Sequence, residues 1–95
     1  MSYPFHVPEG YAEEEITAVI AESIAAHLEF ARRRHLAYQT QCSSFEQRHG
    51  MSTEAFLARF EAGTLGDQQE WFDWYAAAQG KQIWSRKHEI LARLR

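Results

Sequence analysis

The first half of the chain carries apolar residues at alternating steps of four and three. Positions with this spacing lie on one face of a helix, as in the seam of a coiled coil. They are Ile24, Leu28, Ala31, His35, Tyr38, Cys42, Phe45 and His49. No glycine or proline interrupts residues 11–49, and residues that favour helices dominate this stretch. The pattern predicts one long helix over residues 11–48, about 57 Å in length.

The residues at either end of this stretch suit helix termini. Gly10 is expected to be the N-cap, with the run Glu13-Glu14-Glu15 in the first turn, where the helix dipole favours negative charge. Gly50 suits the left-handed position that ends a helix. The pair Ser43-Ser44 leaves a bend open near the end of the helix. Residues 1–10 are expected to form an irregular tail.

Two more helices are predicted in the second half of the chain. Ser52 has the side chain and position of an N-cap, and the apolar spacing after it predicts a short helix over residues 53–62. Asp67 is expected to cap a third helix over residues 67–94. Gly80 marks a place where this helix either bends or continues straight.

These elements predict an all-α fold, with a long N-terminal helix, a short connecting helix and a long aromatic-rich helix that folds back along the first. A chain of 95 residues suits a single domain, assigned to residues 11–95. A helix this long exposes more apolar surface than such a chain covers, so we expect a homo-oligomer, most simply a dimer. The residues expected in the oligomer seam are Ile24, Leu28, Tyr38 and Phe45.

The hydrophobic content and the net charge of the chain exclude some classes of protein. The chain has 45% hydrophobic residues and a formal net charge of -3. It is therefore expected to fold, and it has no global positive field to attract nucleic acid or an anionic membrane. Nucleic-acid binding stays open only through the local basic run Arg32-Arg33-Arg34. No signal peptide or membrane span is apparent, and the single Cys42 fits a reducing compartment, so a cytoplasmic location is expected.

The residue types that carry out chemistry form no catalytic pattern. No two of the five histidines are three or four positions apart, which is the spacing at which one helix presents two ligands to a metal ion. Cys42 lies on the apolar stripe, where a cysteine packs as a small hydrophobic residue. We therefore expect no enzyme activity, no metal site and no cofactor.

Aromatic residues crowd the start of the predicted third helix. Four of the five residues 71–75 are aromatic, and they cannot all face one core, so some are expected to bind a partner protein. The predicted anchors are Trp71, Trp74, Tyr75 and Trp84. The carboxylates Asp67, Glu70 and Asp73 are expected to face a basic surface of that partner.

The second half of the chain also carries short motifs in a fixed order. Gly50-Met51-Ser52 is followed by Phe56 and Phe60, then by Gly63-Thr64-Leu65-Gly66-Asp67, then by Trp71-Phe72-Asp73-Trp74. In these motifs, residues 49–84 resemble a group of small prokaryotic helical proteins that are commonly labelled antitoxins and are often encoded beside a toxin-like gene. The chain departs from this group at Gln68-Gln69 and at Gly80.

The resemblance implies an antitoxin-like protein that neutralises a partner toxin by direct protein binding. The alternative is a non-catalytic structural or adaptor module that dimerises or docks in a larger complex. A toxin-like gene beside this one favours the first interpretation, and an unrelated operon favours the second.

Overall fold

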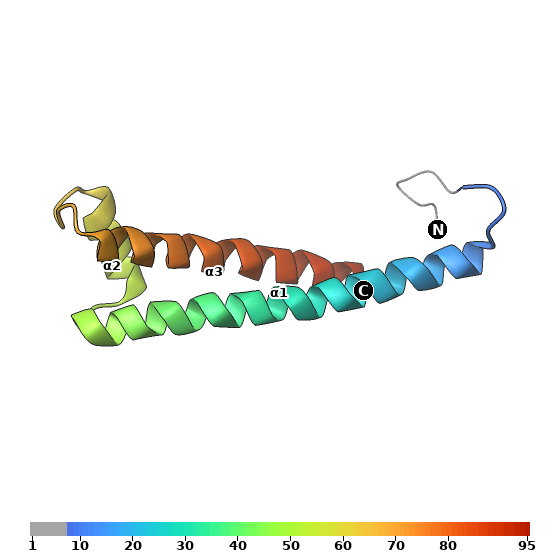
Figure 1. Cartoon of the computed structure of the whole chain (residues 1–95), viewed down its shortest axis with the longest axis horizontal. Helices are drawn as coiled ribbons and strands as arrows, with labels where there is room; N and C mark the ends of the chain where they lie inside the picture. Colours follow the sequence, from blue (N-terminus) through green and yellow to red (C-terminus); the bar gives the residue numbers. More distant parts are fainter. Residues whose placement is uncertain (1–7) are drawn as a thin grey trace.

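The computed structural model describes residues 8–95, which form three helices. They are α1 (Glu13–His49), α2 (Thr53–Glu61) and α3 (Gln69–Leu94). α3 runs back alongside α1 in the opposite direction, and α2 lies across the end where α1 finishes and α3 begins (Figure 1). The described residues contain no strand. The predicted all-α arrangement of a long helix, a short helix and a long returning helix is confirmed.

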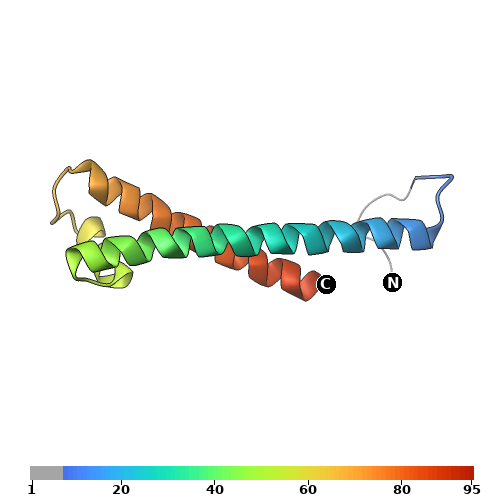
Figure 2. The same ribbon diagram turned by 60° about the horizontal axis from the view of Figure 1, so that its bottom comes forward.

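The molecule is an elongated helical hairpin with one closed and one open end. Its principal extents are 60 × 21 × 20 Å. The N-terminal part of α1 extends beyond the end of α3, and no other helix of residues 8–95 lies beside it (Figures 1 and 2). All three helices meet at the closed end, and the buried residues of the main core gather there.

The start of α1 lies two residues later than predicted. Gly10 takes a positive φ of 91° in a turn, so the N-cap is Ala12 and not Gly10. Glu15 supports this start, because its Oε1 accepts a hydrogen bond from the Ala12 N–H at 3.1 Å. At the other end Gly50 is left-handed and donates its N–H to the carbonyl of Glu46 at 2.8 Å, as predicted. Of the predicted tail, residues 1–7 lie outside the described residues, and residues 8–12 precede the helix.

The N-cap of α2 is the residue predicted from the sequence, and the N-cap of α3 is not. Ser52 is the N-cap of α2, and its Oγ accepts a hydrogen bond from the Ala55 N–H at 3.1 Å, as predicted. The prediction for Asp67 is wrong, because the N-cap of α3 is Gln68. Gly66 takes a positive φ of 89°, and Asp67 lies one position before the N-cap.

Gly80 lies where the backbone of α3 comes close to an aromatic ring of α1. α3 is continuous through this position. A Cβ atom added at Gly80 would lie 2.7 Å from the ring of Tyr38. The Tyr38 hydroxyl accepts a hydrogen bond from Arg34 Nη2 at 2.8 Å, which holds the ring in place. The weak helix propensity of glycine is therefore offset by a close approach that a larger residue would prevent.

The core at the closed end is built around a stack of aromatic rings. Trp74 lies nearly parallel between Phe45 of α1 and Phe56 of α2, with ring centroids 5.5 Å and 4.0 Å away. Trp74 and Phe56 are both fully buried. The remaining buried members of this core are Cys42, Ala77 and Ala78. Each helix thus contributes one ring to the stack, and the stack fixes the position of α2 against the hairpin.

A chain of hydrogen bonds joins the three helices beside this stack. Trp74 Nε1 donates to Thr53 Oγ1 at 3.2 Å, and Thr53 Oγ1 donates to Glu46 Oε2 at 2.9 Å. The Thr53 N–H donates to the same carboxylate oxygen at 2.8 Å. Because Trp74 is fully buried, its indole N–H needs such a partner inside the protein.

The apolar seam of α1 is used within a single chain. Leu28 is 9% exposed, and Tyr38 and Phe45 pack against the core. Of the four residues predicted for an oligomer seam, the chain itself therefore buries Leu28 and partly buries Tyr38 and Phe45. The fourth, Ile24, is half-buried.

Candidate partner-binding site

The aromatic residues predicted to bind a partner do not share one surface. Trp74 is fully buried in the aromatic stack, and Thr53 accepts the hydrogen bond from its indole N–H. A partner protein cannot reach this side chain while the chain is folded, so the prediction that Trp74 is a partner anchor is wrong. Large aromatic side chains serve cores and interfaces equally well, and their spacing does not separate the two roles.

Trp71 and Glu70 lie where the start of α3 meets the end of α1. The half-buried Trp71 ring has its centroid 4.6 Å from that of His49. Glu70 forms an ion pair with Arg48, and its Oε1 lies 3.0 Å from His49 Nε2. These two neighbours, His49 before Arg48, hold the pKa of the Glu70 carboxyl below its ordinary value. Glu70 is thus engaged inside the chain, and the partner contact predicted for it stays a prediction.

Tyr75 and Trp84 are half-buried at two separate places on α3. Tyr75 stacks on Phe60 of α2, with ring centroids 4.7 Å apart. Trp84 meets Phe30 of α1 edge to face at 5.3 Å, and Lys87 Nζ lies 4.5 Å from the Trp84 ring centroid. Each ring keeps an exposed part, but the two do not form a continuous patch.

The side of α3 opposite Trp74 carries a row of exposed apolar side chains. Their spacing of eleven, seven and four residues places them along one side of a helix. The residues are Phe72, Ile83, Ile90 and Leu94, with exposed fractions from 46% to 61%. We call this row the α3 outer stripe. Sequence reasoning missed it, although the spacing is visible in the sequence.

Two of the three predicted carboxylates are exposed near one end of the α3 outer stripe. Asp67 precedes the helix, and Asp73 follows Phe72 directly. Asp73 Oδ1 accepts a hydrogen bond from Gln69 Nε2 at 3.1 Å, which restrains its side chain. The stripe therefore combines four exposed apolar side chains along α3 with negative charge at the end nearest α2.

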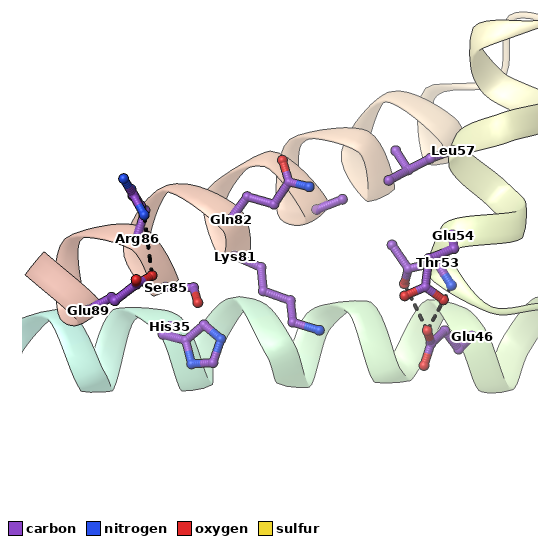
Figure 3. Close-up of a pocket in the computed structure, with 11 residues that line it drawn as sticks. His35, Glu46, Thr53, Glu54, Leu57, Lys81, Gln82, Ser85, Arg86 and Glu89 are labelled. Carbon is purple, nitrogen blue, oxygen red and sulfur yellow. Dashed lines mark hydrogen bonds and ion pairs between the residues drawn. The ribbon is translucent and has the colours of Figure 1, made fainter.

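A polar groove of about 380 Å³ lies between α1 and α3, beside the start of α2. Figure 3 shows Lys81 reaching from α3 towards α1, between His35 and Glu46. The Glu46 carboxylate already accepts two hydrogen bonds from Thr53. Residues of both charge signs line the groove, so it offers polar contacts on the side of α3 that faces α1.

Residues 8–95 offer neither a metal-binding cluster nor an activated thiol. No group of three or more His, Cys, Asp or Glu side chains in this part of the chain is placed to hold a metal ion. Within the same residues, no helix combines the length and the apolar character needed to cross a bilayer. Burial raises the pKa of the Cys42 thiol, so the thiol stays protonated at neutral pH and is a poor nucleophile.

Comparisons with models of protein families, with curated proteins and with solved structures find no match for this chain.

Proposed function

We propose that this chain is the antitoxin-like component of a toxin–antitoxin pair and that it neutralises its toxin by direct protein binding. The observation that carries the proposal is the α3 outer stripe, a row of exposed apolar side chains on a helix that α1 supports from behind. The motif resemblance of residues 49–84 supports a toxin as the partner.

A row of exposed apolar side chains on one side of a helix favours docking in an apolar groove of another protein. Phe72, Ile83 and Ile90 are each about half exposed in the isolated chain. Complete burial of the exposed half of each side chain contributes about 1 kcal/mol. The four residues of the stripe together contribute about 4 kcal/mol, and the flanking contacts supply the rest of the affinity.

Charge at the end of the stripe gives the complex an orientation. Asp67 and Asp73 are exposed near the start of α3, and the whole chain carries a formal net charge of -3. A toxin that acts on nucleic acid has a basic surface around its site, which these carboxylates complement. We therefore place the basic surface of the toxin against the start of α3.

Co-expression with the protein encoded beside this chain tests the proposal. The original chain is expected to restore growth and to co-purify with that protein. The double variant Ile83→Asp with Ile90→Asp puts two charges in the stripe and is expected to lose both effects. The matched control, Gln82→Asp with Ser85→Asp, adds the same charges at exposed positions that line the groove, and it is expected to keep both.

Circular dichroism of the purified variants shows that each is folded before growth is compared. Growth rescue by the stripe variant at the level of the original chain would contradict the proposal, and so would a failure of the original chain to restore growth. A complex that forms with a non-toxic protein supports the second candidate, a structural or adaptor module. The open N-terminal part of α1 favours that candidate, because it offers a second surface for assembly (Figure 2).

The proposed function includes self-association of the chain as a homodimer. Large apolar side chains are exposed on α1 as well as on α3; those on α1 and just before it are Tyr11, Val19, Phe30 and Leu36. One chain therefore has apolar surface left for a second copy after the toxin occupies the α3 outer stripe.

A further inference from the structure

The part of α1 that extends beyond α3 is defined by the register between the two helices. Gly80 lies against Tyr38, and Trp84 lies against Phe30, on antiparallel helices. With equal rise along the two helices, the Gly80–Tyr38 contact makes Leu94 level with about residue 24, and the contact between the longer Trp84 and Phe30 side chains makes it level with about residue 20. Residues 13–23 project past the level set by the backbone of Gly80, and we call them the α1 arm. Eleven helical residues make the arm about 16 Å long.

The apolar seam of α1 continues along the arm, past the end of α3, where Ile16, Ile20 and Ile24 are half-buried. Ile24, Ile20 and Ile16 follow one another at steps of four, which keeps them on the face that packs against α3 further along. Val19 beside them is 62% exposed. Together with Tyr11, the arm residues border a shallow hollow of about 490 Å³.

The charges of the arm and of the end of α3 are opposite. The four charged residues of the arm are all acidic, namely Glu13, Glu14, Glu15 and Glu22. The last ten residues of the chain contain four basic residues and one acidic residue; they are Arg86, Lys87, Glu89, Arg93 and Arg95. Both surfaces lie on one chain, so a second copy offers the complement of each.

From the seam, the charges and the lengths, we infer that two copies of this chain pair through their α1 arms in antiparallel orientation. The isoleucines of one arm pack on those of the other arm about a two-fold axis near Ala18. Each arm then lies beside the part of the other copy's α1 that extends past its α3. Glu13 and Glu14 of one copy reach Arg93 and Arg95 of the partner subunit, and the N-terminus of α1 meets the C-terminus of that α3, so the helix dipoles also attract.

This inference deepens the self-association included in the proposed function and does not depend on the toxin. Two arms of this length bury an area at the low end of specific interfaces, below about 1,200 Å². We therefore expect a monomer–dimer equilibrium with a dissociation constant on the order of 10 μM.

Sedimentation equilibrium of the purified chain alone, from about 1 μM to about 500 μM, measures this constant. Ile20→Asp is expected to raise it at least about tenfold, because a charge enters the apolar contact. Ala18→Asp is the matched control, since positions two apart on a helix point about 200° from each other. Ala18 is exposed, and its substitution is expected to change the constant less than about threefold.

A charge exchange tests the orientation of the two copies. Glu13→Arg with Glu14→Arg is expected to weaken the dimer, and so is Arg93→Glu with Arg95→Glu. An equal mixture of the two variants is expected to restore dimerisation, because each arm then meets a complementary α3 end. A chain that sediments as a monomer throughout, equal effects of Ile20→Asp and Ala18→Asp, or a mixture that fails to associate overturns the inference. Growth rescue by a monomeric Ile20→Asp variant would show that toxin binding holds without the dimer.

Discussion

Replacement of Gly80 by alanine tests how closely α1 and α3 pack. Alanine is better than glycine inside a helix by about 1 kcal/mol, so helix propensity alone predicts that Gly80→Ala stabilises the fold. The structure predicts the opposite, because the new Cβ would lie 2.7 Å from the ring of Tyr38. Overpacking of this kind destabilises a fold by about 1–3 kcal/mol.

Whether the overpacking outweighs the gain in helix propensity depends on whether the Tyr38 ring has room to move. Its hydroxyl is held by Arg34 at 2.8 Å, and the Arg34 Cζ lies 4.9 Å from the ring centroid. The ring is therefore held at its tip and on one face. We expect Gly80→Ala to lower the free energy of unfolding by about 1 kcal/mol, equivalent to about 4–8 °C in the thermal midpoint of a chain of this size.

Urea unfolding followed by circular dichroism measures this change, and a double-mutant cycle identifies its cause. In a Tyr38→Ala background the clash is absent, so Gly80→Ala is expected to raise the free energy of unfolding by up to about 1 kcal/mol. Stabilisation by Gly80→Ala in the original chain would refute the reasoning. A change of the same sign and size in both backgrounds would refute it as well.

Three other substitutions test separate features in the same unfolding assays. Thr53→Val leaves Trp74 Nε1 without its acceptor and should lower the free energy of unfolding by about 1–3 kcal/mol, whereas the exposed Thr40→Val should change it by less than about 0.5 kcal/mol. Ser52→Ala removes the N-cap of α2 and should lower it by about 1 kcal/mol, and no change would argue against the cap. The lowered folded-state pKa of Glu70 contributes stability that is present above its ordinary value of 4.5 and is lost as pH falls through the folded-state value. Glu70→Gln should therefore flatten the fall of the thermal midpoint in acid, and an unchanged slope would contradict this role.

The fold was predictable because its main determinants are local. A long stretch without glycine or proline and an apolar spacing near 3.6 residues define each helix before any tertiary contact forms. The caps at Ser52 and Gly50 follow from single residue types in the right place. Gly10 and Asp67 are residue types that suit an N-cap equally well. Gly10 itself and Gly66, just before Asp67, take positive φ, and both helices start further along the chain. The type of the capping residue alone does not indicate this backbone geometry.

The site was less predictable because burial depends on the path of the whole chain. Trp71, Trp74 and Tyr75 lie on neighbouring turns, yet only Trp74 is fully buried between α1 and α2. Phe72, between Trp71 and Asp73, stays exposed on the other side of α3. The role of Gly80 depends on Tyr38, more than forty positions away in the sequence, so no local pattern indicates it.

The central claim is that the α3 outer stripe binds a partner protein, and the affinity of the purified complex tests it most directly. Calorimetric titration compares the original chain with the Ile83→Asp, Ile90→Asp variant and with the Gln82→Asp, Ser85→Asp control, against the protein encoded beside this chain. We predict that the stripe variant raises the dissociation constant at least about 100-fold, while the control changes it less than about threefold. Equal dissociation constants for the original chain and the stripe variant would contradict the account.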